Sequence, residues 1–229
     1  FMNETPEKPA AGEEPPSVPE TAVPKAVVAR LSLYSRELQH LLHEGQETTN
    51  SSQLGKRLGV TDAQVRKDLA YFGQFGYPGI GYRCNELVEQ IRRILGTSEL
   101  WSVALIGLGN LGHALLRYRG FSKQGFRIDA AFDISPQLIG QQIGSLEILP
   151  LEQLGEVVKR QGIRLAILTV PAAAAQEVAD QLAEAGIAGI LNFAPVTLSL
   201  PDHVAAAGVD LAIELEQLAF AVVNLGSKP

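Results

Sequence analysis

The chain has 229 residues, of which 46% are hydrophobic, and a formal net charge of −6 at pH 7, which suits one large globular domain or two modest ones. Its single cysteine, Cys84, excludes an internal disulfide framework and is typical of a reducing compartment. No run of about 18 apolar residues occurs and no secretion signal begins the chain, so we expect a cytoplasmic protein without a membrane segment.

Charge and composition divide the chain into unequal sections. Residues 25–95 contain ten Lys and Arg against seven Asp and Glu, a net of +3, whereas residues 1–24 have a net of −4 and residues 96–229 a net of −5. The acidic total argues against a nucleic-acid partner, but the basic section permits one. Residues 1–24 are rich in Pro, Glu and Ala with few large apolar side chains, which predicts a disordered arm.

Helical periodicity begins at Lys25. Apolar residues then recur at steps of three and four as far as Gly45, which predicts an amphipathic helix. A short helix is expected over SSQLGKRLG, and another after Thr61, which we expect to form a capping box with Gln64. The side chains expected on the open face of that helix are Gln64, Arg66, Lys67 and Asp68.

The segment that follows, GQFGYPGIGYRCN, is dense in glycine and aromatic residues, as a short β-hairpin wing would be. Helical spacing returns over residues 86–95. The order of short helix, capped helix and wing within the basic section predicts a winged helix–turn–helix over residues 25–96, with the capped helix in a DNA major groove. The alternative is a small helical dimerisation or substrate domain whose Arg and Lys side chains are only solvated.

The stretch WSVALIGLGNLG, residues 101–112, predicts a buried strand that ends in a GxGxxG turn. The helix expected after the turn would present free N–H groups and a positive dipole end to a diphosphate. Gly107 would allow the tight turn, Gly109 the approach of the phosphates, and Gly112 the close packing of helix and strand. A GxGxxG motif alone is weak evidence for such a site.

An acidic residue at the expected distance supports the motif. FRIDAAFD predicts a second strand that ends in Asp133, which lies 21 positions beyond Gly112. Dinucleotide-binding folds place an acid about 20 residues on, where it accepts hydrogen bonds from the adenosine ribose hydroxyls. This spacing favours NAD(H) over NADP(H).

The rest of the chain alternates strands and helices, as a doubly wound parallel sheet over residues 97–211 requires. Strands are expected over IGSLEILP, RLAILTV and IAGILNFAP, with a last one over residues 208–213. Two segments, Thr169–Pro171 and Asn192–Pro195, follow predicted strands. Because ligands of open α/β sheets bind at the carboxyl ends of strands, we expect both segments to flank the nicotinamide half of the cofactor. The fold class is therefore α/β, with an N-terminal winged helix domain.

The terminal section, residues 212–229, contains a predicted helix that is apolar over most of its circumference. Such a helix needs burial on nearly all sides. Either it lies in the core of its own chain, or it inserts into a partner chain. The second alternative gains weight because helix–turn–helix proteins usually bind two half-sites as two-fold dimers.

No catalytic group stands out in the sequence. A dehydrogenase needs a proton donor or acceptor near the nicotinamide, yet none of the four histidines follows a predicted strand in a polar cluster. The chain has no Cys/His spacing typical of a metal site, and Cys84 is best explained as a small packing residue. A chain that binds a redox cofactor without a catalytic base is better explained as a sensor than as an enzyme.

Several motifs in order resemble the Rex family of bacterial redox-sensing transcriptional repressors, from about residue 25 to residue 225. They include QVRKDLAYFG, GLGNLG, LTVPAAAAQEVAD and GILNFAP. The resemblance implies a homodimer of two-domain chains with a terminal helix exchanged between subunits. It also implies binding to palindromic operator DNA when NADH is scarce and release when NADH binds, with NAD⁺ a weaker competitor.

The resemblance also implies roles for single residues. The implied cofactor contacts are Gly107, Gly109, Asn110, Leu111, Gly112, Tyr118, Asp133, Ile134, Thr169, Val170, Pro171, Asn192, Phe193, Ala194, Pro195 and Asp210. The implied DNA contacts are Ser51, Thr61, Gln64, Arg66, Lys67, Tyr71, Gly79, Gly81 and Tyr82. Arg36, Tyr118 and Asp210 are the implied switch residues. The alternatives are an NAD-dependent dehydrogenase or reductase with a helical accessory domain, and a nucleotide- or CoA-binding subunit of a larger enzyme.

Overall fold

The computed structural model describes residues 23–225, which form two compact units that divide between Glu99 and Leu100. Nearly all of the predicted N-terminal arm lies outside the described residues. The division falls three residues beyond the predicted end of the winged helix domain at residue 96. Within the described part, no helix has both the length and the hydropathy to cross a membrane.

The first unit is assembled on α1 (Lys25–His43), which begins and ends close to its predicted bounds. Its apolar stripe, which includes Leu31 and Leu38, is fully buried against α4 (Cys84–Ile94) and α2 (Ser51–Leu58). Ile91 of α4 closes the same core. An amphipathic helix with one buried face thus anchors the other elements of this unit.

Two capped helices form the predicted helix–turn–helix. Asn50 caps α2 (Ser51–Leu58) through a hydrogen bond from the backbone N–H of Gln53, at 2.8 Å. Thr61 caps α3 (Asp62–Ala70) in the same way, with its side-chain oxygen 3.1 Å from the backbone nitrogen of Gln64. Side-chain acceptors of this kind stabilise a helix start by about 1 kcal/mol.

The predicted wing is present in a different form. The strand β2 (Tyr82–Arg83) pairs antiparallel with β1 (Thr48–Thr49), which precedes α2 and was not predicted. The glycine-rich segment between α3 and β2 forms a tight loop closed by one antiparallel bridge, between Tyr77 and Gly81. Two-residue strands carry too little periodicity to be found in a sequence.

The second unit contains a seven-stranded sheet in the order β5-β6-β4-β3-β7-β8-β9, of which every pairing is parallel except that of β5 with β6. Without the edge strand β5, this is the Rossmann order in which two halves meet at β3 and β7. The strands are β3 (Trp101–Ile106), β4 (Phe126–Asp133), β5 (Gln142–Ile143), β6 (Leu146–Pro150), β7 (Leu165–Leu168), β8 (Gly189–Asn192) and β9 (Ala205–Gly208).

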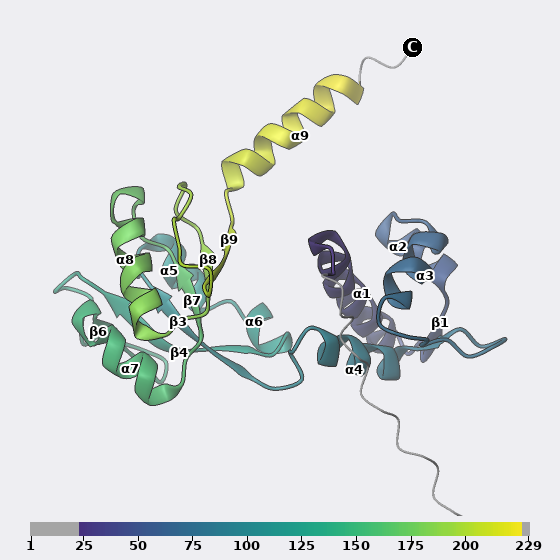
Figure 1. The fold of residues 1–229 in the computed structure, drawn as a ribbon, viewed down its shortest axis with the longest axis horizontal. Coiled ribbons are helices and arrows are strands. Elements are labelled where there is room, and N and C mark those ends of the chain that lie inside the picture. Colours follow the sequence, from purple (N-terminus) through teal and green to yellow (C-terminus); the bar gives the residue numbers. More distant parts are fainter. Residues whose placement is uncertain (1–22, 226–229) are drawn as a thin grey trace, which may run out of the picture. The chain divides into compact units, whose positions relative to one another are not determined.

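Alternate residues of β3 face two separate apolar clusters. Ala104 and Ile106 pack with α7 (Leu154–Gln161) and α8 (Ala172–Ala185), which follow the 3₁₀ turn η1 (Leu151–Gln153). Figure 1 shows these helices beside the strands. The opposite face, with Val103 and Leu105, is covered in part by α5 and α6. These two short helices are α5 (Asn110–Leu116) and α6 (Gly120–Lys123).

One predicted strand is wrong. Residues 208–213 do not form the last strand, because β9 is Ala205–Gly208 and a helix, α9 (Leu211–Leu225), has begun by Leu211. The sequence of β9 is AAAG, which has no strand signal of its own, and its pairing with β8 decides its conformation. Every residue of α9 is exposed in the single chain, although the helix is mostly apolar.

Candidate functional site

The glycine turn after β3 has the geometry that its sequence predicts. Gly107 has φ +91°, a left-handed conformation that favours glycine, and a Cβ there would lie 2.8 Å from the carbonyl oxygen of Thr169. A Cβ on Gly112 would collide with the carbonyl oxygen of Gly107. No atom lies within 4 Å of the Cβ position of Gly109, so the backbone there is open to a ligand.

Asp133 ends β4 beside this turn and holds it in place. One carboxylate oxygen accepts a hydrogen bond from the backbone N–H of Leu108 at 2.5 Å, and the other accepts one from Ser135 at 2.8 Å. Each carboxylate oxygen has two acceptor sites, so both oxygens can still accept a ribose hydroxyl. The acid therefore holds the glycine turn in place and keeps acceptor capacity for a ligand hydroxyl.

Thr169 connects the end of β7 to the same turn. Its hydroxyl oxygen lies 2.7 Å from the carbonyl oxygen of Gly107 and 3.0 Å from that of Ile106. The carboxyl ends of β3, β4 and β7 are thus held side by side, where they border a cavity of about 660 Å³. A volume of this size is typical of ligand sites.

The cavity brings together many of the predicted cofactor residues. Those that line it are Gly107, Gly109, Leu111, Asp133, Ile134, Thr169, Val170, Pro171 and Phe193. The predicted residues absent from its lining are Asn110, Gly112, Tyr118, Asn192, Ala194, Pro195 and Asp210. Asn192 is buried and supports the loop instead, because its amide nitrogen donates to the carbonyl of Val196 and its oxygen accepts from the N–H of Ala194.

Sequence reasoning missed one wall of this cavity. Ala174, Glu177, Val178 and Gln181 of α8 line it, together with Leu151. These four helix residues are spaced i, i+3, i+4 and i+7, so they share one helical face. The spacing was visible in the alanine-rich helix, but nothing in the sequence tells which face of a helix borders a cavity.

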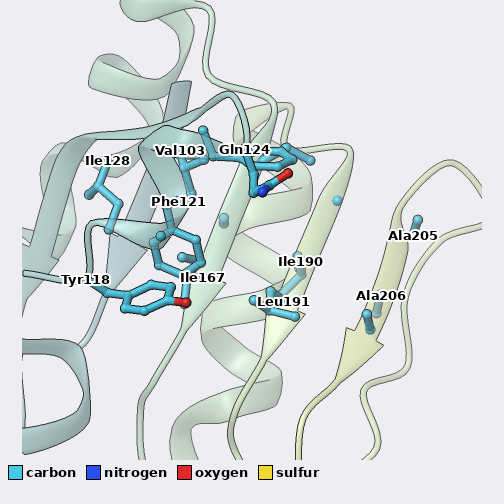
Figure 2. Close-up of a pocket in the computed structure, with 16 residues that line it drawn as sticks. Val103, Tyr118, Phe121, Gln124, Ile128, Ile167, Ile190, Leu191, Ala205 and Ala206 are labelled. Atoms are coloured by element: carbon cyan, nitrogen blue, oxygen red, sulfur yellow. The ribbon is translucent and has the colours of Figure 1, made fainter. Parts of the chain in front are cut away.

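Tyr118 lies at a second cavity, of about 510 Å³, rather than at the glycine turn. Tyr118 is 60% exposed, and its ring packs edge-on against that of Phe121, with ring centroids 5.2 Å apart. Figure 2 shows both rings on one side of this cavity, with Ile190 and Leu191 of β8 facing it from the sheet. Asp210 accepts backbone hydrogen bonds at the start of α9, from Ala212 at 2.9 Å and Ile213 at 3.3 Å.

The exposed side of α3 carries the basic residues predicted to contact DNA. The Arg66 guanidinium is 2.7 Å from a carboxylate oxygen of Asp62 and 3.0 Å from the hydroxyl of Ser51 at the start of α2. The Arg66 side chain is 56% exposed and that of Asp62 47%, so this ion pair is a weak surface contact that a phosphate can replace. Lys67 is exposed beside it.

Asp68 was expected on this open face, and that expectation is wrong. Its side chain is fully buried, and its carboxylate accepts hydrogen bonds from Arg30, from the Tyr34 hydroxyl at 2.7 Å and from the Gln64 amide at 2.7 Å. Gln64 therefore contributes only its backbone N–H to the capping of α3, and the reciprocal half of the predicted capping box is absent. A buried carboxylate requires several donors, which the neighbouring residues on α1 and α3 supply.

The wing residues fall into two groups. Gly79 is exposed at the tip of the loop, and Gly81 lies at its base beside Thr49. Tyr82, an implied DNA contact, has its side chain buried in the core of the first unit, so it offers DNA little more than its backbone. Tyr71, directly after α3, is half-buried.

Other chemistry has little support among the described residues. Within residues 23–225, no group of three or more His, Cys, Asp or Glu side chains is placed to hold a metal ion. Cys84 is buried, and burial raises the pKa of its thiol, as expected for a packing residue. Its thiolate form is therefore disfavoured.

Comparisons with known proteins give separate matches for the two units. A family model described as "Putative DNA-binding protein N-terminus" matches residues 22–70, and one described as "CoA binding domain" matches residues 98–196. The redox-sensing transcriptional repressor Rex of Carboxydothermus hydrogenoformans is 48% identical over 86% of this chain and 95% of its own length. The chain belongs to the Rex family. The Rex repressor of Syntrophobacter fumaroxidans is also 48% identical, with the same coverage of both chains.

Solved structures of Rex repressors share both units. RSP, a Rex-family repressor, superposes with a TM-score of 0.84 and 37% identity in its complex with β-NAD⁺ and operator DNA, over 90% of this chain and 95% of RSP. The RSP complex with β-NADH gives a TM-score of 0.81, at 36% identity over 90% of this chain and 97% of RSP. Rex proteins are transcriptional repressors, so the expectation that this chain is not an enzyme is confirmed.

Proposed function

We propose that this protein is a redox-sensing transcriptional repressor that binds operator DNA as a homodimer and releases it when NADH binds. The observation that carries the proposal is the pairing, in one Rex-family chain, of a capped helix–turn–helix with a cavity bordered by a glycine turn and Asp133. RSP, which is similar over nine-tenths of this chain, has been crystallised with operator DNA and with either form of the cofactor. A repressor works where the chromosome is, so we assign this protein to the cytoplasm.

The cofactor is NADH, with NAD⁺ as a weaker competitor. The open backbone at Gly109 lies at the start of α5, where N–H groups without helical partners can bind the diphosphate. Asp133 is positioned to accept hydrogen bonds from the ribose hydroxyls, and its negative charge would repel the 2′-phosphate of NADP(H). Asn110 and Leu111, at the start of α5, would supply further contacts to the diphosphate.

The DNA partner is a double-stranded palindromic operator. Arg66 and Lys67 lie on the exposed side of α3 and supply the positive charge that phosphates or guanine edges require. Ser51 at the start of α2 and Gly79 at the wing tip would contact the phosphate backbone of the DNA. Two copies related by a two-fold axis would read the two half-sites of the palindrome.

The dimer is formed by exchange of α9. This helix exposes Leu215, Leu218, Phe220 and Val223 at 59–73%. The cavity beside Tyr118 (Figure 2) is lined mainly by apolar residues of β3, β4, β7, β8, β9 and α6. We propose α9 of a second copy as its occupant. Each fully buried Leu, Val or Phe side chain contributes about 1.5–3 kcal/mol, enough in total to hold two chains together.

The cofactor's charge sets the switch. NAD⁺ has a positive nicotinamide ring and NADH a neutral one, so groups near the ring that pair in one state can re-pair in the other. We assign this role to Tyr118, Asp210 and the exposed Arg36 of α1, with partners drawn from both subunits. The two states would differ in the relative orientation of the two winged helix domains of the dimer.

A gel-shift titration tests the proposal. Full-length protein is bound to a palindromic promoter site and titrated first with NADH and then with NAD⁺. NADH should release the DNA at lower concentration than NAD⁺, and by linkage operator DNA should weaken NADH binding by the same factor. Equal NADH affinity with and without operator would contradict the repressor mechanism. Steady oxidation of NADH with a small carbonyl compound would favour a dehydrogenase instead.

A further inference from the structure

The cofactor cavity has a mixed wall on α8. Two apolar residues of this wall, Ala174 and Val178, alternate along the helix with two polar ones, Glu177 and Gln181. Ile134 and Leu151, which follow β4 and β6, line the same cavity. This part of the cavity is therefore a mainly apolar slot that also presents a carboxylate and an amide.

The position of Asp133 decides what enters this slot. If Asp133 binds the adenosine ribose, as the proposed function holds, the base attached to that ribose lies next to Ile134. A purine is flat and apolar on its two faces, and its hydrogen-bonding groups all lie on its edge. The apolar walls fit the faces, and the two polar side chains of α8 meet the edge.

We propose that Glu177 and Gln181 select the adenine base of the cofactor by hydrogen bonding to its edge. An ionised carboxylate only accepts hydrogen bonds, so Glu177 is matched to the 6-amino group of adenine. The Gln181 amide donates to the neighbouring ring nitrogen. This inference rests on the proposed function, because it requires that the cavity binds a dinucleotide.

The same groups disfavour a base with a carbonyl at position 6. In hypoxanthine the 6-amino group is replaced by a carbonyl oxygen, and the neighbouring ring nitrogen bears a hydrogen. Glu177 would then face another acceptor, and the Gln181 amide would face a donor unless it turned over. Leaving such groups unpaired is the usual basis for rejection of an analogue.

Reduced nicotinamide hypoxanthine dinucleotide is the matched probe, since it differs from NADH only in the base. Isothermal titration of the full-length protein should give about tenfold weaker binding of this probe than of NADH, the loss expected for one unmade hydrogen bond at a partly exposed site. The Glu177→Gln variant can donate to the 6-carbonyl oxygen. Its preference for NADH should fall to about one or reverse.

Glu184→Gln is the control. Glu184 lies on the same helix, seven residues beyond Glu177, is exposed and is absent from the cavity lining, so removal of the same charge there should leave the preference unchanged. An equal preference in the wild type and in Glu177→Gln would overturn the adenine inference while leaving NADH binding established. No binding of either dinucleotide to the wild-type protein would overturn both the inference and the proposed function.

Discussion

The Arg30 guanidinium donates two hydrogen bonds to the carboxylate of Asp68, at 2.5 and 2.8 Å, and so joins α1 to the helix that we propose reads DNA. Asp68 is fully buried, whereas a quarter of the Arg30 side chain is exposed. The Tyr34 hydroxyl, also from α1, donates to the same carboxylate. The position of α3, and with it that of Arg66 and Lys67, therefore depends on a buried ionic contact rather than on apolar packing alone.

Removal of Arg30 should destabilise the first unit more than neutralisation of Asp68. Arg30→Met leaves a buried carboxylate without its counter-charge, which costs about 3–5 kcal/mol. Asp68→Asn retains an acceptor for Tyr34 and leaves Arg30 able to reach water, so the cost should be about 1–3 kcal/mol. Hydrogen exchange of the α3 amides reports the free energy of opening in each variant. A larger loss in Asp68→Asn would show that the charge is not the source of the stability.

The same contact should make the first unit sensitive to acid. Burial raises the pKa of Asp68, but hydrogen bonds from Arg30, Tyr34 and Gln64 together hold the pKa below its ordinary value. A lowered pKa in the folded state stabilises the protein above the unfolded-state value, about 3.9, and this contribution is lost as the pH falls below it. The opening free energy of α3 should therefore fall between pH 5 and the folded-state pKa, and the fall should be smaller in Asp68→Asn.

Substitution of Gly112 by Ala should damage the cofactor site. The new Cβ would collide with the carbonyl oxygen of Gly107, so the start of α5 must move away from the turn. We expect a loss of about 1–3 kcal/mol in stability and at least about tenfold in NADH affinity. Gly155→Ala on α7 is the control, since no atom lies within 4 Å of its Cβ position, and it should stabilise the helix by about 0.5–1 kcal/mol.

Loss of Arg66 or Lys67 should weaken operator binding without affecting NADH. Each Ala variant removes one cation from the exposed side of α3, so the slope of log affinity against log salt should fall by about one. Arg160→Ala provides the control, because it removes an exposed arginine from α7 of the other unit. Normal operator affinity in both α3 variants would mean that a different element contacts the DNA.

Phe220→Asp should shift the protein from dimer toward monomer. Phe220 is 73% exposed in the single chain, and a charged side chain in its place would oppose burial of this position in a partner. Glu216→Gln, one turn earlier, removes a charge from α9 and introduces none, so it should leave the dimer intact. Sedimentation velocity at micromolar concentration distinguishes the two states. A dimeric Phe220→Asp protein would contradict the exchange of α9.

Apolar periodicity, capping residues and glycines predicted most helices and strands, because these signals act over a few neighbouring positions. Thr61 indicates the start of α3, and the apolar run before Gly107 indicates β3. The same reasoning failed at Ala205–Gly208, where alanines form a strand only because β8 lies beside them. It also missed β1, and with it the pairing that joins residues 48–49 to residues 82–83.

The sequence by itself determined which chemical groups this protein offers: a glycine turn after a buried strand, an acid at the end of the next strand, a basic helix and an apolar terminal helix. These are properties of residue type and short spacing, which one stretch of chain expresses alone. Only the tertiary structure decided which side chains face the same space. It buried Asp68 against Arg30, placed Tyr118 at the apolar cavity, and brought Glu177 and Gln181 into the lining of the cofactor cavity. Burial and convergence depend on how distant elements pack, and spacing along the chain does not specify that packing.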